Sequence, residues 1–316
     1  MQAAVVDSLG QPPAYKTFPD PVLSEGETLV KVRACGLHPI VKAIAGGQHY
    51  IGTAEVPFVP GVDAVGTLED GCRVYFGFVR KPWGTMAELA AAPLKMCIPI
   101  PDGLDLNVAA AIANPGMSAW LSLKERGGLS RGETVLVMGA TGVAGQLAIQ
   151  VARQLGAKRV VAVGRNVEAL SNADVDVIIS LGESEDSICE ALTAEVRSGI
   201  DVIIDYLWGR PAELLLESVA KGFSASSTHR TRWVEVGESA GRTVTLPGAV
   251  LRSVDLTLLG SGFGAASLDR VLAAIPELFA MAAAGTLSIA VEAVPLTEVQ
   301  SAWGRTEKGR RIVFTV

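Results

Sequence analysis

The most constraining feature of the sequence is an alternation of short β-branched segments with helical patterns, which begins near residue 134. The strand-like segments show little alternation of polar and apolar residues, as is typical of strands that are covered on both faces. They are TVLVMG, RVVAVG, VDVIIS, DVIIDY, RWVEVG and LTLLGSG. Six such strands with helical crossovers predict an α/β fold with a doubly wound parallel sheet.

The segment VLVMGATGVAGQLA, residues 135–148, joins the first of these strands to the first helix. Ala140, Gly142 and Gly145 occupy the three positions of a G-x-G-x-x-G turn, with alanine in the first. The pattern alone is weak evidence, because glycine also serves a purely structural corner. Here a strand precedes the turn and an amphipathic helix follows it. The context therefore predicts that backbone N–H groups at the helix start bind a pyrophosphate.

The tip of the next strand reads Gly164, Arg165 and Asn166. An NAD-selective site has Asp or Glu about 20 residues beyond the turn, where the carboxylate accepts hydrogen bonds from the ribose hydroxyls. Arginine cannot accept a hydrogen bond, but its planar guanidinium group matches a phosphate. We therefore predict NADPH or NADP as the cofactor. A solvated surface arginine is the alternative.

Composition narrows the class of protein. A chain of 316 residues accommodates two domains of about 150 residues each. The formal net charge of −6 argues against general nucleic-acid binding. The first residues, MQAAVVDSLGQPP, do not read as a secretion signal. Proline or charge interrupts apolar segments such as AELAAAPLKMCIPI well short of the roughly 20 residues that a membrane span needs. We expect a cytoplasmic protein with a small-molecule substrate and no nucleic-acid or membrane partner.

The first hundred residues differ from the alternating region. Extended segments such as ETLVKVRACGL and CRVYFGF are separated by glycine and proline, which predicts a compact, mostly β unit. The last stretch, from LSIAVEAVP to RRIVFTV, returns to strand, short helix and strand. We expect it to rejoin the first unit.

Several motifs together resemble the medium-chain dehydrogenase/reductase superfamily, and within it the zinc-independent quinone oxidoreductases and related enone reductases. They include EGETLVKVRACGLHP, PFVPGVDAVGTLEDGCRVY, GTMAELAAAP, AAAIANPGMSAWLSL, GETVLVMGATGVAGQLAIQVARQLGA, DVIIDYLWG and LTLLGSGFG, in the family's order. The resemblance implies a GroES-like catalytic domain, residues 1–112 and 253–316, around a Rossmann domain, residues 113–252. It also implies a homodimer paired through the last strand of the sheet.

The zinc-dependent relatives bind their metal at positions that correspond to His38, Val62 and Asn114. Valine cannot bind zinc, and one imidazole with one carboxamide falls short of the three protein ligands of a catalytic site. Asp63 could substitute only in an unusual register. We expect no metal. Without a Lewis acid, the hydride is expected to go to an electron-poor acceptor, a quinone or an α,β-unsaturated carbonyl.

Three side chains are candidates for assisting catalysis. Tyr50 corresponds to a tyrosine that relatives carry near the nicotinamide, where its hydroxyl can bind the substrate oxygen or supply a proton. His38 stands where these reductases more often carry asparagine, so it is a candidate proton donor or hydrogen-bond partner of the substrate. Asn114 is a candidate for contact with substrate or the nicotinamide ribose. The alternatives are a loop tyrosine packed on its ring, a satisfied structural histidine and a structural asparagine.

The resemblance also assigns cofactor contacts. In the turn they are Ala140, Thr141, Gly142, Val143, Ala144 and Gly145. The nicotinamide is expected against the backbone of Tyr206 and Leu207, of Val236 and Gly237, and of Gly260, Ser261 and Gly262.

The favoured hypothesis is an NADPH-dependent reductase of quinones or enones. An NADP-dependent carbonyl or alcohol dehydrogenase, with an aldehyde as a possible substrate, is one alternative. A non-enzymatic NADPH-binding sensor or structural protein is the other.

Overall fold

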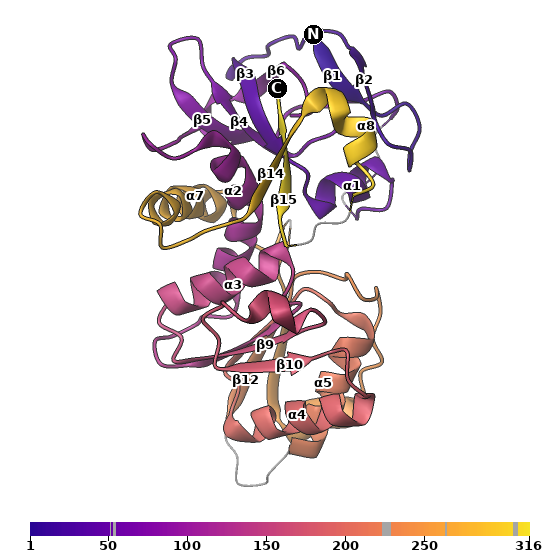
Figure 1. The fold of residues 1–316 in the computed structure, drawn as a ribbon, viewed down its shortest axis with the longest axis vertical. Coiled ribbons are helices and arrows are strands. Elements are labelled where there is room, and N and C mark those ends of the chain that lie inside the picture. The colour runs from indigo at the N-terminus through magenta and orange to yellow at the C-terminus, as the bar shows by residue number, and fades with distance from the viewer. Residues whose placement is uncertain (51, 53–54, 223–228, 263, 306–308) are drawn as a thin grey trace. The chain divides into compact units, whose positions relative to one another are not determined.

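The computed structural model describes residues 1–50, 52, 55–222, 229–262, 264–305 and 309–316. The chain divides into two compact units, shown in Figure 1. One unit comprises Met1–Asn114 and Leu272–Val316, and the other comprises Pro115–Val271. The two boundaries fall within helices α2 (Leu106–Trp120) and α7 (Leu268–Ala283).

The second unit contains a six-stranded parallel sheet in the order β10-β9-β8-β11-β12-β13. The strands are β8 (Thr134–Met138), β9 (Arg159–Gly164), β10 (Val177–Ser180), β11 (Val202–Asp205), β12 (Arg230–Glu235) and β13 (Asp255–Gly260). All six strands that the sequence predicts are present, and the doubly wound Rossmann sheet is confirmed. The strand order reverses between β8 and β11, and ligands of such sheets bind outside the carboxyl ends at this point.

The parallel sheet is covered by helices, and its central strands are therefore apolar on both sides. Residues 135–138 of β8 are all fully buried, which explains why this strand shows no polar alternation. The helices are α3 (Val143–Gln154), α4 (Glu185–Ser198), α5 (Gly209–Gly222) and α6 (Gly248–Ser253). One hydrophobic cluster joins strand residues such as Leu136 and Trp233 to Leu192 of α4 and Leu215 of α5.

The first unit is mostly β structure, as the sequence predicts. Its main sheet has the order β14-β15-β3-β4-β5-β7, with β6 also paired to β3, and β1 and β2 form a separate pair. The strands are β1 (Gln2–Val5), β2 (Ala14–Thr17), β3 (Glu27–Gly36), β4 (Asp63–Thr67), β5 (Arg73–Gly77), β6 (Leu89–Pro93), β7 (Ile98–Pro99), β14 (Val291–Pro295) and β15 (Arg311–Thr315). This unit also contains two short helices, α1 (Pro39–Ala45) and α8 (Val299–Ala302), and the adjoining parts of α2 and α7. β15 pairs antiparallel with β3, so the end of the chain rejoins its beginning.

The return of the chain to the first unit comes later than residue 253. β13 pairs in parallel with β12 over six residues and so belongs to the Rossmann sheet. The division of the chain then falls at Leu272. The physical reason is the segment DLTLLG, which continues the parallel sheet as its edge strand rather than starting a new unit.

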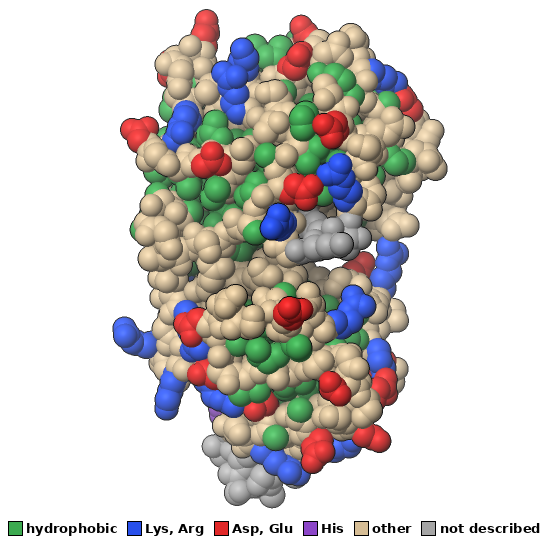
Figure 2. Space-filling view, in the orientation of Figure 1, with side chains coloured by type: hydrophobic (Ala, Val, Ile, Leu, Met, Phe, Trp, Pro, Cys, Tyr) green, Lys and Arg blue, Asp and Glu red, His purple; other side chains and the backbone are tan. Residues whose placement is uncertain are grey.

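The charged side chains are distributed over the surface. Figure 2 shows acidic and basic groups interspersed on the displayed face. Within the described part of the chain, no helix has both the length and the apolar character to cross a membrane.

Candidate cofactor and catalytic sites

The glycine turn follows β8 directly and leads into α3. Gly142 is the N-cap of α3, with extended backbone, and no side chain of the described residues caps this helix start. The first N–H groups of an α-helix have no partner within the helix. Together with the helix dipole, they favour an anion at this position.

The two glycines of the turn have different surroundings. A Cβ atom on Gly145 would lie 2.2 Å from the carbonyl oxygen of Gly139 and 2.7 Å from Cα of Ala140, so no larger residue fits. A Cβ on Gly142 would meet only the Gly139 oxygen, at 3.4 Å, and Gly142 is exposed. Gly145 thus permits close packing of α3 on the turn, whereas Gly142 leaves backbone open to a ligand.

The tip of β9 lies beside this turn. Gly164, the last residue of β9, is buried, and a Cβ there would lie 2.6 Å from Cγ2 of Thr141. Arg165 and Asn166 follow at the surface, and both are exposed. Arg165 forms no ion pair with any described carboxylate, which leaves its guanidinium group available to an anion.

The loop after β11 is shaped by a buried carboxylate. Oδ1 of Asp205 accepts hydrogen bonds from the backbone N–H groups of Leu207, at 2.8 Å, and Trp208, at 3.0 Å. Oδ2 accepts from the indole N–H of Trp233 at 3.2 Å. Burial raises the pKa of Asp205, and these donors oppose the increase. The carboxylate thereby fixes the backbone of Tyr206 and Leu207.

The loops after β11 and β12 are joined by hydrogen bonds. The N–H of Ala240 donates to the Leu207 oxygen at 2.7 Å, and the Ser239 hydroxyl donates to the Tyr206 oxygen at 2.7 Å. The N–H of Val236 donates to the Asp205 oxygen at 2.8 Å. The structure therefore brings the two predicted segments, 206–207 and 236–237, together at the carboxyl edge of the sheet.

The end of β13 joins the same edge. Gly260 is paired with Glu235, the last residue of β12, and the N–H of Ser261 donates to the Glu235 oxygen at 2.8 Å. Gly262 follows and is exposed. The cofactor residues predicted from the sequence thus lie at the carboxyl ends of strands of one sheet or in the segments directly after them.

A buried hydroxyl of this region was not predicted from the sequence. The Tyr206 hydroxyl is shut off from solvent. Burial raises the pKa of Tyr206, and the side chain of Ser118, on α2, acts in the opposite direction. From the sequence we assigned only the backbone of Tyr206 to the cofactor. The environment of its side chain depends on α2, which is distant in sequence, so no local pattern predicts it.

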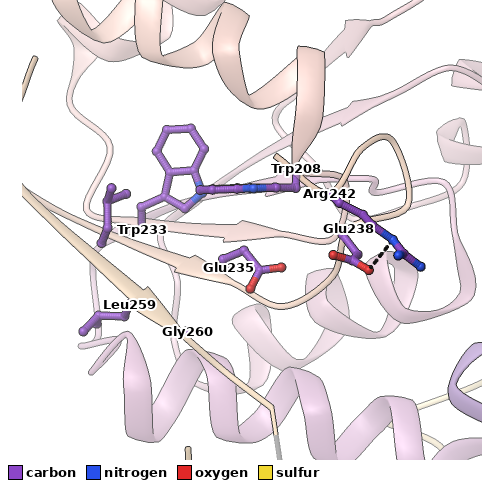
Figure 3. Close-up of a pocket in the computed structure, with 8 residues that line it drawn as sticks. Trp208, Trp233, Glu235, Glu238, Arg242, Leu259 and Gly260 are labelled. Carbon is purple, nitrogen blue, oxygen red and sulfur yellow. Dashed lines mark ion pairs between the residues drawn. The ribbon is translucent and has the colours of Figure 1, made fainter. Parts of the chain in front are cut away.

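A cavity of about 360 Å³ lies at the carboxyl ends of β12 and β13 (Figure 3). It is lined by Trp208, Trp233, Glu235, Glu238, Arg242, Leu258, Leu259 and Gly260. The two tryptophan rings meet edge to face with centroids 6.4 Å apart. Burial raises the pKa of Glu235, and the charges of Asp205 and Glu238 raise it further. The cavity shares Gly260 with the predicted nicotinamide site.

His38 lies in the interior of the first unit. Its side chain is fully buried, and Nε2 is 3.4 Å from Oδ1 of Asp63. The Tyr75 hydroxyl donates to Oδ2 of the same carboxylate at 2.9 Å. Burial raises the pKa of Tyr75, and the Asp63 charge adds to this. Gly36 makes room for the imidazole, because a Cβ there would lie 2.4 Å from Nε2. This burial argues against direct contact between His38 and a substrate.

The other two catalytic candidates have different environments. Tyr50 follows α1 and is 70% exposed, with its ring centroid 4.3 Å from that of His49. Asn114 is half-buried on α2. Exposure leaves the Tyr50 hydroxyl accessible to a ligand.

The positions that hold zinc in the metal-dependent relatives do not form a suitable donor set. Val62 offers no ligand, and both oxygens of Asp63 face side chains of the first unit, His38 and Tyr75. Among the described residues, no group of three or more His, Cys, Asp or Glu side chains is arranged to bind a metal ion.

No protein-family model matches the chain. The chain is 28% identical over 359 aligned positions to a probable NADPH-dependent quinone reductase, tdiC, of Emericella nidulans, with 99% of each chain covered. It is 32% identical to the quinone oxidoreductase of Sus scrofa, with 66% of each chain covered. Among solved structures, the quinone oxidoreductase of Thermus thermophilus matches with a TM-score of 0.79 and 28% identity over both complete chains. The chain belongs to the quinone oxidoreductase group of the medium-chain dehydrogenase/reductase superfamily.

The family resemblance seen in the sequence is therefore confirmed. A mycobacterial quinone oxidoreductase, 24% identical, matches the fold with a TM-score of 0.83 over both complete chains. The whole quinone oxidoreductase fold, and not the Rossmann sheet alone, is thus present in this chain.

Proposed function

We propose that this chain is an NADPH-dependent oxidoreductase that transfers hydride to a quinone or an α,β-unsaturated carbonyl. The observation that carries the proposal is the uncapped start of α3 with exposed Arg165 beside it, in a member of the quinone oxidoreductase group. The relative of Emericella nidulans is named an NADPH-dependent quinone reductase, and the Thermus thermophilus enzyme was also solved as a complex with NADPH.

The second unit supplies the cofactor site in this proposal. Backbone N–H groups at the start of α3 bind the pyrophosphate, and Arg165 binds the 2′-phosphate. The segments 206–207, 236–237 and 260–262 hold the nicotinamide end. When bound, NADPH supplies the hydride.

The first unit supplies the substrate contacts. The exposed Tyr50 hydroxyl donates a hydrogen bond to the substrate oxygen, on which negative charge develops during reduction. The Asn114 carboxamide orients the substrate or the ribose. His38 is buried, so its role in this proposal is to position the chain and not to contact the substrate. It is the N-cap residue of α1 and pairs with Asp63, and it thereby fixes the start of the segment that leads to Tyr50.

We propose that the reaction needs no metal and that the acceptor is therefore already electron-poor. Val62 and the engaged Asp63 leave His38 without the further ligands that a catalytic zinc site needs.

We also propose a homodimer in the cytoplasm. β13 is the edge strand of the parallel sheet, and Leu256, Leu258 and Leu259 are only partly buried there. An apolar edge strand is a template for pairing with a second copy. The four cysteines are free thiols, as is usual in a reducing compartment.

The test is a kinetic screen of the purified chain. NADPH oxidation is followed with quinones, enones and aldehydes, with and without a chelator, and NADH is compared under the same conditions. Faster oxidation with a quinone or enone, unaffected by the chelator, supports the proposal. Tight NADPH binding with no turnover across the panel would instead identify a non-enzymatic cofactor-binding protein.

A further inference from the structure

A π-helical turn at the end of α2, Leu121–Arg126, contacts the end of β13 at two consecutive residues. The buried hydroxyl of Ser122 donates a hydrogen bond to the Ser261 hydroxyl at 2.9 Å. Nε of Arg126 donates to the carbonyl oxygen of Gly260 at 2.8 Å. Both contacts lie within the second unit.

Beyond its backbone pairing with Glu235 of β12, the end of β13 has little side-chain packing to hold it in place. Gly260 is exposed, and a Cβ on it would meet no atom within 4 Å. β13 is an edge strand, and β12 is the one strand of the described residues that pairs with it. Glycine is also more mobile in its backbone than other residues. The position of residues 260 and 261 therefore depends on hydrogen bonds rather than on side-chain packing.

The backbone of the π-helical turn is held by a hydrogen bond and by close packing. The N–H of Gly127 donates to the Ser122 oxygen at 2.8 Å, five residues earlier, which is the hydrogen-bond pattern of a π-helix. A Cβ on Gly127 would lie 2.9 Å from Cγ1 of Val202, so the backbone packs closely on β11 at this point. Ser122 and Arg126 therefore lie on a backbone segment that is held against β11.

We propose that Ser122 and Arg126 are positioning residues that hold Gly260 and Ser261 where the nicotinamide half of NADPH binds. This inference rests on the proposed function, which places the nicotinamide against these two residues. It assigns no contact between Ser122 or Arg126 and the cofactor.

The inference predicts that substitutions in the π-helical turn affect binding of one half of the cofactor and not of the other. The pyrophosphate and 2′-phosphate contacts come from the start of α3 and from Arg165. Among the described residues, the side chains of Ser122 and Arg126 hydrogen-bond to Ser261 and Gly260 and not to that helix start or to Arg165. Loss of Ser122 or Arg126 should therefore weaken binding of NADPH but not of 2′-phospho-ADP-ribose, which lacks the nicotinamide ring.

The experiment measures the dissociation constants of both ligands for the full chain. The variants are Ser122→Ala, Arg126→Met and Arg126→Lys, and thermal unfolding checks that each is folded. Arg270→Met is the matched control, because Arg270 forms an exposed ion pair with Glu125 on the same turn. One hydrogen bond is worth about 1 kcal/mol, so we expect the NADPH constant to rise about fivefold in Ser122→Ala and Arg126→Met. Arg126→Lys should recover part of the loss, and Arg270→Met should match the wild type.

The outcomes distinguish the two proposals. If the wild type binds neither ligand, the proposed function fails and this inference fails with it. If the wild type binds both, and the variants weaken both ligands equally or neither, the positioning role is wrong while the proposed function stands. A selective loss of NADPH affinity supports the inference. Arg126 is only half-buried, so its variants test the inference even if Ser122→Ala does not fold.

Discussion

Nε2 of His38 lies 3.4 Å from Oδ1 of Asp63 in the interior of the first unit, and both side chains are almost completely buried. A buried charge depends on its partners, because removal of one partner leaves the other desolvated and uncompensated. The Tyr75 hydroxyl on Oδ2 makes Asp63 the shared member of this cluster.

Asp63→Asn should therefore destabilise the chain strongly. The amide keeps the shape of the carboxylate but removes its charge, and we expect a loss of about 3 kcal/mol in the free energy of unfolding. Denaturant-induced unfolding measures this change. The matched control is Asp7→Asn, which breaks an exposed ion pair with Lys16 and should cost less than about 1 kcal/mol. Equal effects of the two substitutions would contradict a structural role for the buried cluster.

Tyr50 and His38 should differ in the kind of defect that their loss produces. Tyr50→Phe keeps the ring and removes an exposed hydroxyl, so kcat should fall about 10–100-fold with little change in thermal stability. His38→Asn should mainly lower the free energy of unfolding, since the imidazole is buried against Asp63. Steady-state kinetics and thermal unfolding of both variants check this. A large loss of kcat in a stably folded His38→Asn variant would restore His38 as a proton donor.

Gly142 and Gly145 offer a matched pair of alanine substitutions in the glycine turn. Gly145→Ala forces a methyl group against backbone atoms of residues 139 and 140, so we expect a loss of about 3 kcal/mol in stability. Gly142→Ala has room in the fold but places its methyl group where the pyrophosphate is expected. Its NADPH dissociation constant should rise about tenfold, equal to about 1.4 kcal/mol, with stability nearly unchanged. Calorimetric titration and thermal unfolding separate the two effects, and unaltered NADPH affinity in folded Gly142→Ala would place the pyrophosphate elsewhere.

Arg165→Ala tests the choice of cofactor. The substitution removes the proposed charge-assisted hydrogen bonds to the 2′-phosphate, so the NADPH dissociation constant should rise about 10–100-fold. The constant for NADH, which lacks that phosphate, should change little. Competition titrations with both cofactors provide the measurement. An unchanged preference for NADPH over NADH would show that a group other than Arg165 binds the 2′-phosphate.

The fold was predictable because its signals are local. Six apolar segments, a glycine turn and the helix behind it each lie within a short stretch of sequence, and their order specifies a doubly wound sheet. The environment of His38 was not predictable, because it depends on Gly36 and on Asp63, which reaches it from another strand. The contact between Arg126 and Gly260 joins residues 134 positions apart for the same reason. Local patterns locate the candidate site, whereas tertiary packing decides which side chains reach it.

Glu235 gives the last prediction, which concerns pH. It lines the cavity of Figure 3, and burial together with the charges of Asp205 and Glu238 raises its pKa in the folded state. A carboxyl group with a raised folded pKa favours the folded state when protonated, so its contribution to stability is lost as pH rises through that pKa. Glu235→Gln removes the ionised form and should raise the unfolding free energy at neutral pH. The gain should shrink as pH falls through the folded pKa, because wild-type Glu235 is then neutral as well. Denaturant unfolding of both proteins across a pH series measures the difference, with Glu298→Gln as the exposed control. A gain that persists at acidic pH would assign the effect to packing rather than to charge.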